Sequence, residues 1–149
     1  MTDPAPLSGN LSGAHSFETA PLMIRVAAQS DIDELGHVNN AVYLSWAQDI
    51  ATAHWRSRAG ADILQKYVWV ALRHEIDYRD QTFAGETVEI RTWLGAVSGP
   101  RYERHVDIRK PGSSRAAAKV LTVWCLIDAE MCKPKRVGPE ILTSFGVTA

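Results

Sequence analysis

The strongest constraint on the fold is a run of four segments in which apolar and polar side chains alternate. The first covers residues 68–78 and places on one mostly apolar face Val68, Val70, Leu72, His74, Ile76 and Tyr78. Residues 87–94 and 101–109 repeat the alternation, and residues 116–127 are apolar on both faces, as in a central strand. Short turns separate the segments, so we expect an antiparallel meander.

A single amphipathic helix precedes these strands, from about Asn40 to Arg58. Its apolar residues recur every three or four positions and form one broad stripe: Tyr43, Trp46, Ala47, Ile50, Ala53 and His54. Asn39 and Asn40 both suit the N-cap, because a side-chain oxygen there accepts a backbone N–H. The helix is roughly 28 Å long and must bury its stripe against the sheet. A strand over 22–28 and a short helix over 139–145 complete an α+β fold.

Length and composition favour one globular domain. The chain has 149 residues, and we expect a flexible tail over 1–21, rich in Pro, Ser, Gly and Thr, before a single domain over 22–149. The net charge of −1 offers no excess of cations for a phosphate backbone, so no nucleic-acid partner is expected. No apolar run reaches about 18 residues, so no membrane insertion is expected. The two cysteines and an N-terminus unlike an export signal indicate a cytoplasmic protein.

The densest chemical signal lies between residues 31 and 48, at the start of the predicted helix. Carboxylates, His37 and a pair of asparagines surround Gly36, which tolerates a positive φ. A helix N-terminus offers free N–H groups and the positive end of the helix dipole, which can stabilise an oxyanion. A carboxylate beside it can act as general base or nucleophile. The alternative is structural, with Asp33 capping a turn and Asn39 capping the helix.

The string Asp-Glu-Leu-Gly-His-Val-Asn-Asn-Ala-Val-Tyr-Leu at 33–44 resembles the signature of hotdog-fold acyl-CoA thioesterases. The family is that of 4-hydroxybenzoyl-CoA thioesterase, to which the acyl-ACP thioesterases are related. The likeness covers residues 22–145 and includes Pro-Lys-Arg-Val-Gly-Pro-Glu-Ile at 134–141. It implies a long helix wrapped by a curved antiparallel five-stranded sheet. It also implies a homodimer or homotetramer in which sheets join edge to edge and active sites form at the interface.

The resemblance assigns roles to three positions. Asp33 matches the catalytic carboxylate, which attacks the thioester carbonyl or activates water. The backbone N–H of Asn40 matches the group that polarises that carbonyl, and His37 matches the histidine of the acyl-ACP thioesterases. The sequence departs from these relatives at Leu35, where they have Asn, and at Gln48, where many have Glu. An Asp33-centred mechanism is therefore expected.

The substrate-binding residues are predicted with less support from the pattern. Basic side chains pair well with the phosphates of coenzyme A, and the candidates are Arg101, Arg104, Lys135 and Arg136. The alternative is that these are solvated surface charges. The acyl pocket is expected to be lined by Tyr43, Trp46 and Val70, although all three are equally suited to a core. No pair of His or Cys residues has ligand spacing, so neither a metal nor a cofactor is expected, coenzyme A being part of the substrate.

The function expected from the sequence is therefore hydrolysis of an acyl-CoA thioester to a free acid and CoA. Two alternatives remain at this stage. The first is an enoyl-thioester hydratase on the same fold, although its usual pairing of a His with an acid in another motif is not found. The second is a non-catalytic acyl-CoA binder or sensor, since a binding site and a slow active site have the same appearance in a sequence.

Overall fold

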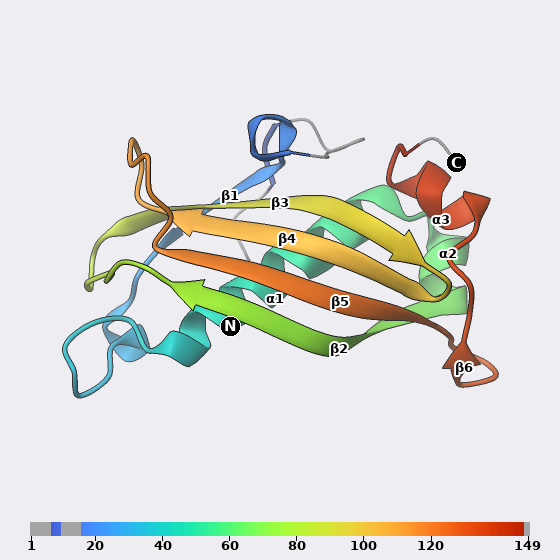
Figure 1. The fold of residues 1–149 in the computed structure, drawn as a ribbon, viewed down its shortest axis with the longest axis horizontal. Helices are drawn as coiled ribbons and strands as arrows, with labels where there is room; N and C mark the ends of the chain where they lie inside the picture. The colour runs from blue at the N-terminus through green and yellow to red at the C-terminus, as the bar shows by residue number, and fades with distance from the viewer. Residues whose placement is uncertain (1–6, 10–15, 148–149) are drawn as a thin grey trace.

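The computed structural model describes residues 7–9 and 16–147, which form one α+β unit (Figure 1). Short 3-10 helices cover Phe17–Thr19 and Gln29–Asp31. The helices are α1 (Asn40–Arg58), α2 (Ala61–Lys66) and α3 (Pro139–Ser144). The strands are β1 (Leu22–Val26), β2 (Tyr67–Tyr78), β3 (Thr87–Ser98), β4 (Arg101–Arg109), β5 (Ala118–Asp128) and β6 (Lys133–Pro134). The long helix has the predicted bounds, whereas α2 and β6 were not predicted.

The sheet is antiparallel, but the prediction of a simple meander is wrong. The strand order is β1-β3-β4-β5-β2, with β6 pairing β5, so β2 lies beside β5 and not beside its sequence neighbour β3. Residues 79–86 connect β2 to β3, which lie on different sides of β4 and β5 in the sheet. The N–H groups of Arg79 and Asp80 both donate to the carbonyl of Ala117, just before β5. Because β2 is paired on one side only among the described strands, it is an edge strand.

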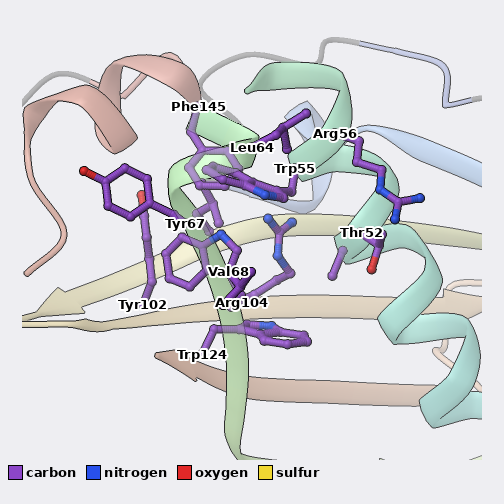
Figure 2. A pocket seen from close by; sticks show the side chains of 13 residues that line it. Thr52, Trp55, Arg56, Leu64, Tyr67, Val68, Tyr102, Arg104, Trp124 and Phe145 are labelled. Carbon is purple, nitrogen blue, oxygen red and sulfur yellow. The ribbon is translucent and has the colours of Figure 1, made fainter. Parts of the chain in front are cut away.

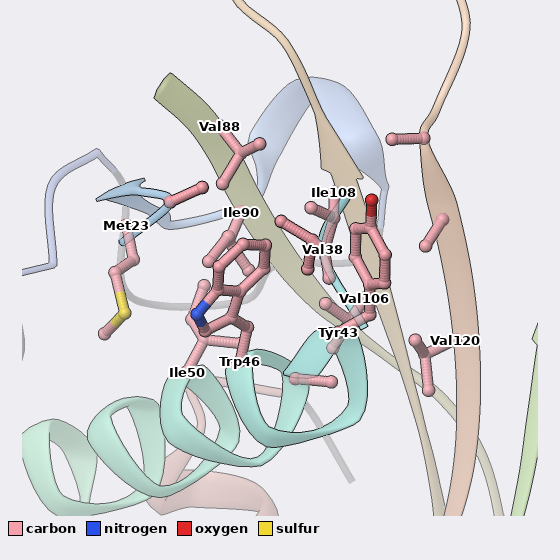
Figure 3. Close-up of a cluster of buried hydrophobic side chains, with 14 residues drawn as sticks. Met23, Val38, Tyr43, Trp46, Ile50, Val88, Ile90, Val106, Ile108 and Val120 are labelled. Carbon is pink, nitrogen blue, oxygen red and sulfur yellow. The ribbon is translucent and has the colours of Figure 1, made fainter. Parts of the chain in front are cut away.

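Helix α1 lies against one face of the curved sheet and crosses it from end to end (Figure 1). Its apolar stripe forms the main core with side chains of β3, β4 and β5 (Figure 3). Tyr43, Trp46 and Ile50 are at most 4% exposed there. A second buried cluster joins Trp55 near the end of α1 to Phe145 just after α3. The helix wrapped by a curved antiparallel sheet is the hotdog fold that the sequence predicted.

A β-bulge in β2 overturns the prediction of a single apolar face on that strand. The pairing of β2 with β5 shifts between Ala71 and Arg73. Trp69 and Ile76 both pack against buried clusters although seven positions separate them, a spacing that strict alternation forbids. The extra residue reverses the alternation, so Val70 is 47% exposed before the bulge while Ile76 packs inward after it. The outer row up to and including the bulge residue consists of Val68, Val70 and Leu72.

The predicted tail over 1–21 falls partly outside the described residues. In its described part, Ser8 and Leu22 exchange two backbone hydrogen bonds of 2.8 Å. The ring of Phe17 lies beneath the guanidinium groups of Arg91 and Arg109, which are 4.6 and 4.3 Å from its centroid. Ordered contacts with the sheet therefore begin before residue 22. Within the described residues, no helix is both long and apolar enough to cross a membrane.

Candidate active site

A tight loop between β1 and α1 holds Asp33. Backbone pairing of Ile32 with Val38 closes the loop. Gly36 donates its N–H to the carbonyl of Asp33 at 3.0 Å. Its φ of +86° is a backbone conformation that residues with a Cβ rarely adopt. The Oδ1 atom of Asp33 accepts the N–H of Leu35 at 2.9 Å. The loop therefore forms the turn that Asp33 and Gly36 predicted, and the hydrogen bond from Leu35 orients the Asp33 carboxylate.

Asn39 connects this carboxylate to the start of α1. Its Oδ1 accepts the N–H of Ala41 at 2.8 Å, which makes Asn39 the N-cap. Its Nδ2 donates to Oδ2 of Asp33 at 3.0 Å. One side chain therefore caps the helix and orients Asp33 against the positive end of the helix dipole. The sequence predicted the cap, but the bond to Asp33 depends on how the loop folds back.

His37 and Asn40 line a small cavity of about 200 Å³ together with Tyr43 and residues 78–81 at the end of β2. Within the described part of the chain, the N–H of Asn40 has no acceptor. The Nδ1 atom of His37 lies 3.3 Å from the carbonyl oxygen of Val38. The structure therefore brings three of the predicted site residues, His37, Asn40 and Tyr43, to one hollow beside the Asp33 loop.

A second and larger cavity of about 510 Å³ opens between the last half of α1 and the sheet (Figure 2). Aromatic side chains dominate its lining, which consists of Ala51, Thr52, Trp55, Arg56, Leu64, Tyr67, Val68, Trp69, Leu94, Tyr102, Arg104, Trp124 and Phe145. Neither Trp46 nor Val70, both predicted for an acyl pocket, is among them: Trp46 is in the core and Val70 on the outer surface. Thr52 lies about 18 Å along α1 from Asn40, at 1.5 Å per residue.

Three of the four predicted CoA-binding cations are exposed at the end of the sheet opposite the Asp33 loop. Arg101 starts β4, and Lys135 and Arg136 follow β6; the N–H of Val137 donates to the carbonyl of Gly99 at 2.9 Å and holds the two segments together. Arg104 differs, because it is 4% exposed and faces the interior. Its place in the alternation with Tyr102 and Val106 already indicated an inward position.

Other acidic and metal-binding groups do not extend the site. Asp49, beside the Gln48 position, forms an ion pair with Arg25 at 3.0 Å and so faces β1. Among residues 7–9 and 16–147, no group of three or more His, Cys, Asp or Glu side chains is placed to hold a metal ion. The absence of a cofactor from the reaction stays a prediction from the sequence.

Comparison with known proteins identifies the class to which this fold and site belong. The family model of the thioesterase-like superfamily matches residues 27–145. The chain belongs to this superfamily, and the prediction of a hotdog-fold thioester hydrolase is confirmed. No curated protein matches the chain.

Solved structures similar to this one have low sequence identity and share the fold. A 1,4-dihydroxy-2-naphthoyl-CoA thioesterase from Synechocystis, Slr0204, has a TM-score of 0.70 and 16% identity over 83% of this chain and 93% of its own. YbaW, a probable thioesterase from Escherichia coli, has a TM-score of 0.71 and 19% identity over 84% and 96%. The hypothetical protein SAV2348 from Staphylococcus aureus, solved in complex with CoA, has a TM-score of 0.73 and 12% identity over 83% and 79%.

The two functions of the Asn39 side chain can be separated by a pair of substitutions. Asn39→Ser keeps an N-cap oxygen but removes the amide that donates to Asp33 and adds no charge, so stability should stay close to that of the wild type while kcat falls. Asn39→Ala removes both contacts and should also lower the free energy of unfolding by about 1 kcal/mol. Urea denaturation and steady-state kinetics on both variants test this. A kcat for Asn39→Ser equal to that of the wild type would show that Asn39 does not position Asp33.

Proposed function

We propose that this protein hydrolyses acyl-CoA thioesters at the start of α1, with Asp33 as the reacting carboxylate. The observation that carries the proposal is the fixed position of Asp33. The Nδ2 atom of Asn39 donates to Oδ2 of Asp33 at 3.0 Å, and the same side chain caps helix α1, which begins at the next residue. A carboxylate restrained in this way beside an unpaired helix N–H combines a base or nucleophile with an oxyanion donor.

The reaction follows from these two groups. Asp33 either attacks the thioester carbonyl, giving a mixed anhydride that water then cleaves, or takes a proton from a water molecule that attacks. In both routes the carbonyl oxygen becomes an oxyanion, and the N–H of Asn40 and the helix dipole stabilise it. The C–S bond then breaks and the CoA thiolate leaves. His37 lines the hollow beside the reacting groups and takes no required part in either route.

A complete site requires two subunits in this proposal. Within one chain, the turn between β3 and β4 and the segment after β6, which carry the exposed cations, lie at the opposite end of the sheet from the loop before α1 (Figure 1). The large cavity is lined by residues of that same end. If two copies join their β2 edges antiparallel around a twofold axis, each end of one sheet lies beside the opposite end of the other. The cavity of one subunit then faces the Asp33 loop of its partner. The unpaired edge of β2 and its outer row of Val68, Val70 and Leu72 support this arrangement.

Coenzyme A is the proposed carrier of the acyl group. The exposed side chains of Arg101, Lys135 and Arg136, at the same end of the sheet as the large cavity, would bind its phosphates. The similar structure of SAV2348, solved in complex with CoA, supports this choice. The cytoplasmic location expected from the sequence agrees with a CoA ester as substrate and stays a prediction.

Breaking the β2 edge should remove both the dimer and the activity. In the double variant Val70→Lys and Leu72→Lys, which spares the cavity, the twofold axis would bring cations of the two copies together, and we expect a monomer with at least about 10-fold lower kcat/KM. Light scattering after gel filtration measures the mass. Val97→Lys is the matched control, because Val97 is 40% exposed on β3 and lies away from this edge. A double variant that stays dimeric and fully active would refute the two-subunit site.

Thiol release from a panel of acyl-CoAs tests the reaction itself. Short, medium, branched and aromatic esters should be supplied at equal concentration, and release of free CoA is expected from at least one class. Conversion of an enoyl-CoA to a hydrated thioester without thiol release would instead indicate a hydratase. Saturable binding of CoA esters with no conversion of any kind would indicate a binder. Either of these two results would overturn the proposal.

A further inference from the structure

Arg104 is a buried cation that the proposed hydrolysis does not use. It projects from β4 and lines the large cavity, where its guanidinium carbon lies 5.5 Å from the centroid of the Phe145 ring (Figure 2). Its Nη1 donates to Nδ1 of His54 at 3.1 Å and to Oγ1 of Thr92 at 2.9 Å. Both acceptors are neutral, because an imidazole nitrogen that accepts carries no proton and the Thr92 hydroxyl donates its own proton to a carbonyl.

No negative charge balances Arg104 within the described residues. It takes part in none of their ion pairs, and no Asp or Glu lines the cavity. The acidic side chain bound to a lining residue is Glu140, which accepts the hydroxyl proton of Tyr67. Burial lowers the pKa of Arg104 to about 10, so the side chain remains charged at neutral pH. A second cation, Arg56, lies at the exposed side of the same cavity.

The other polar side chains of the cavity wall are the hydroxyl groups of Thr52, Tyr67 and Tyr102 and the tryptophan indoles, and none of them carries a negative charge at neutral pH. The indole Nε1 atoms of Trp69 and Trp124 are buried and have no hydrogen-bond partner. Buried donors and an unbalanced buried cation are costly unless a ligand completes them. The cavity is large enough for a small organic group, and its aromatic walls suit an apolar or aromatic spacer. What it lacks is an acceptor with a negative charge.

We propose that this cavity binds the far end of an acyl group that ends in a carboxylate, with Arg104 as the residue that recognises it. The inference rests on the proposed function in taking the bound group to be the acyl part of a thioester. The substrates would then be CoA thioesters of dicarboxylic acids, with the apolar spacer against the aromatic wall and the free carboxylate on the guanidinium group. A charged hydrogen bond in a water-poor cavity is stronger than one at the surface, which makes Arg104 a determinant of specificity.

Binding of small acids tests the cavity without any thioester. Calorimetry should compare 3-phenylpropanoate with 3-phenylpropanamide, which have the same shape but differ in charge. The wild type should bind the acid about 10- to 100-fold more tightly than the amide, as expected for a hydrogen bond to a charged group. Arg104→Met should abolish this preference, and Arg104→Lys should retain part of it. Arg115→Met, in the exposed turn before β5, is the control and should behave as the wild type.

Two results would overturn the proposal. The first is equal binding of acid and amide by the wild type, a comparison that needs no variant and holds even if Arg104→Met fails to fold. The second is a preference for the acid that persists in folded Arg104→Met. The acid would then bind at another site, such as the N-terminus of α1, and not on Arg104.

Hydrolysis of glutaryl-CoA and pentanoyl-CoA separates this inference from the proposed function. The wild type should favour glutaryl-CoA in kcat/KM by about 10-fold or more, and Arg104→Met should lose this ratio. Acid-selective binding without thiol release from any ester would refute the hydrolase and leave the carboxylate site standing. Thiol release with equal rates for both esters and no acid preference would refute the carboxylate site and leave the hydrolase standing.

Discussion

Replacement of Asp33 by Asn should lower kcat by about 10³-fold, within the range that removal of a general base produces. An amide neither attacks the thioester carbonyl nor accepts a proton from water, so both routes open to Asp33 are blocked. The loop should keep its fold, because the Oδ1 of Asn can still accept the N–H of Leu35. The contact with Asn39 would place two NH₂ groups together, which should cost about 1 kcal/mol.

Glu34→Gln is the matched control for this variant. Glu34 is the next residue in the same loop, is exposed, and loses the same charge without touching the bonds that orient Asp33. Thiol release by both variants should be compared at equal protein concentration, with circular dichroism to check the fold. If Asp33→Asn and Glu34→Gln retained the same turnover, Asp33 would have no role as the reacting carboxylate.

Replacement of Trp46 by Ala should produce the largest loss of stability, about 3–5 kcal/mol. Trp46 is 4% exposed and packs edge-on against Tyr43, with ring centroids 5.5 Å apart, inside the main core (Figure 3). Removal of an indole from that position leaves a void that α1 and the sheet cannot fill. A domain of this size has a total stability of roughly 5–15 kcal/mol, so much of it would be lost.

This result also distinguishes a core residue from a pocket residue. A tryptophan that lined an acyl pocket would change the preferred chain length when truncated and would affect stability little. Urea denaturation at a fixed protein concentration measures the loss. Gln48→Ala, two positions along α1 and exposed, should change stability by less than about 0.5 kcal/mol. If the Trp46→Ala variant were as stable as this control and preferred a different chain length, Trp46 would be a pocket residue and not a core residue.

The elements that local pattern specifies were predicted well. Helix α1 has the predicted bounds because its apolar stripe, the Asn39 cap and its arginine-rich end all favour the same segment. Strands β3 and β4 follow their alternation closely, since one face of each packs on α1. The Asp33 turn was identified because Gly36 and the two asparagines have strong local preferences. These signals act over a few residues, so a single sequence contains them.

The features that were missed depend on residues far apart in the chain. The bulge at Leu72 arises from the pairing of β2 with β5, some 50 positions later, and it moved Val70 from the expected pocket to the surface. Arg104 was predicted to bind the phosphates of CoA, whereas the folded chain buries it where it donates to His54 on α1 and Thr92 on β3. The order of strands likewise depends on the pairing of β2 with β5 and not with β3, which residues 79–86 connect to it, and the local pattern does not encode that choice of partner.

The amino-acid sequence therefore established the family, the long helix, the antiparallel strands and the loop with Asp33, because each depends on local periodicity or a short motif. The tertiary structure decided which cavity exists, which residues line it and which charge lies unbalanced within it. Those properties depend on contacts between segments that only the folded chain brings together. The bond from Asn39 to Asp33 connects the two levels: a capping residue read from the sequence becomes a positioning residue once the loop folds back onto the helix.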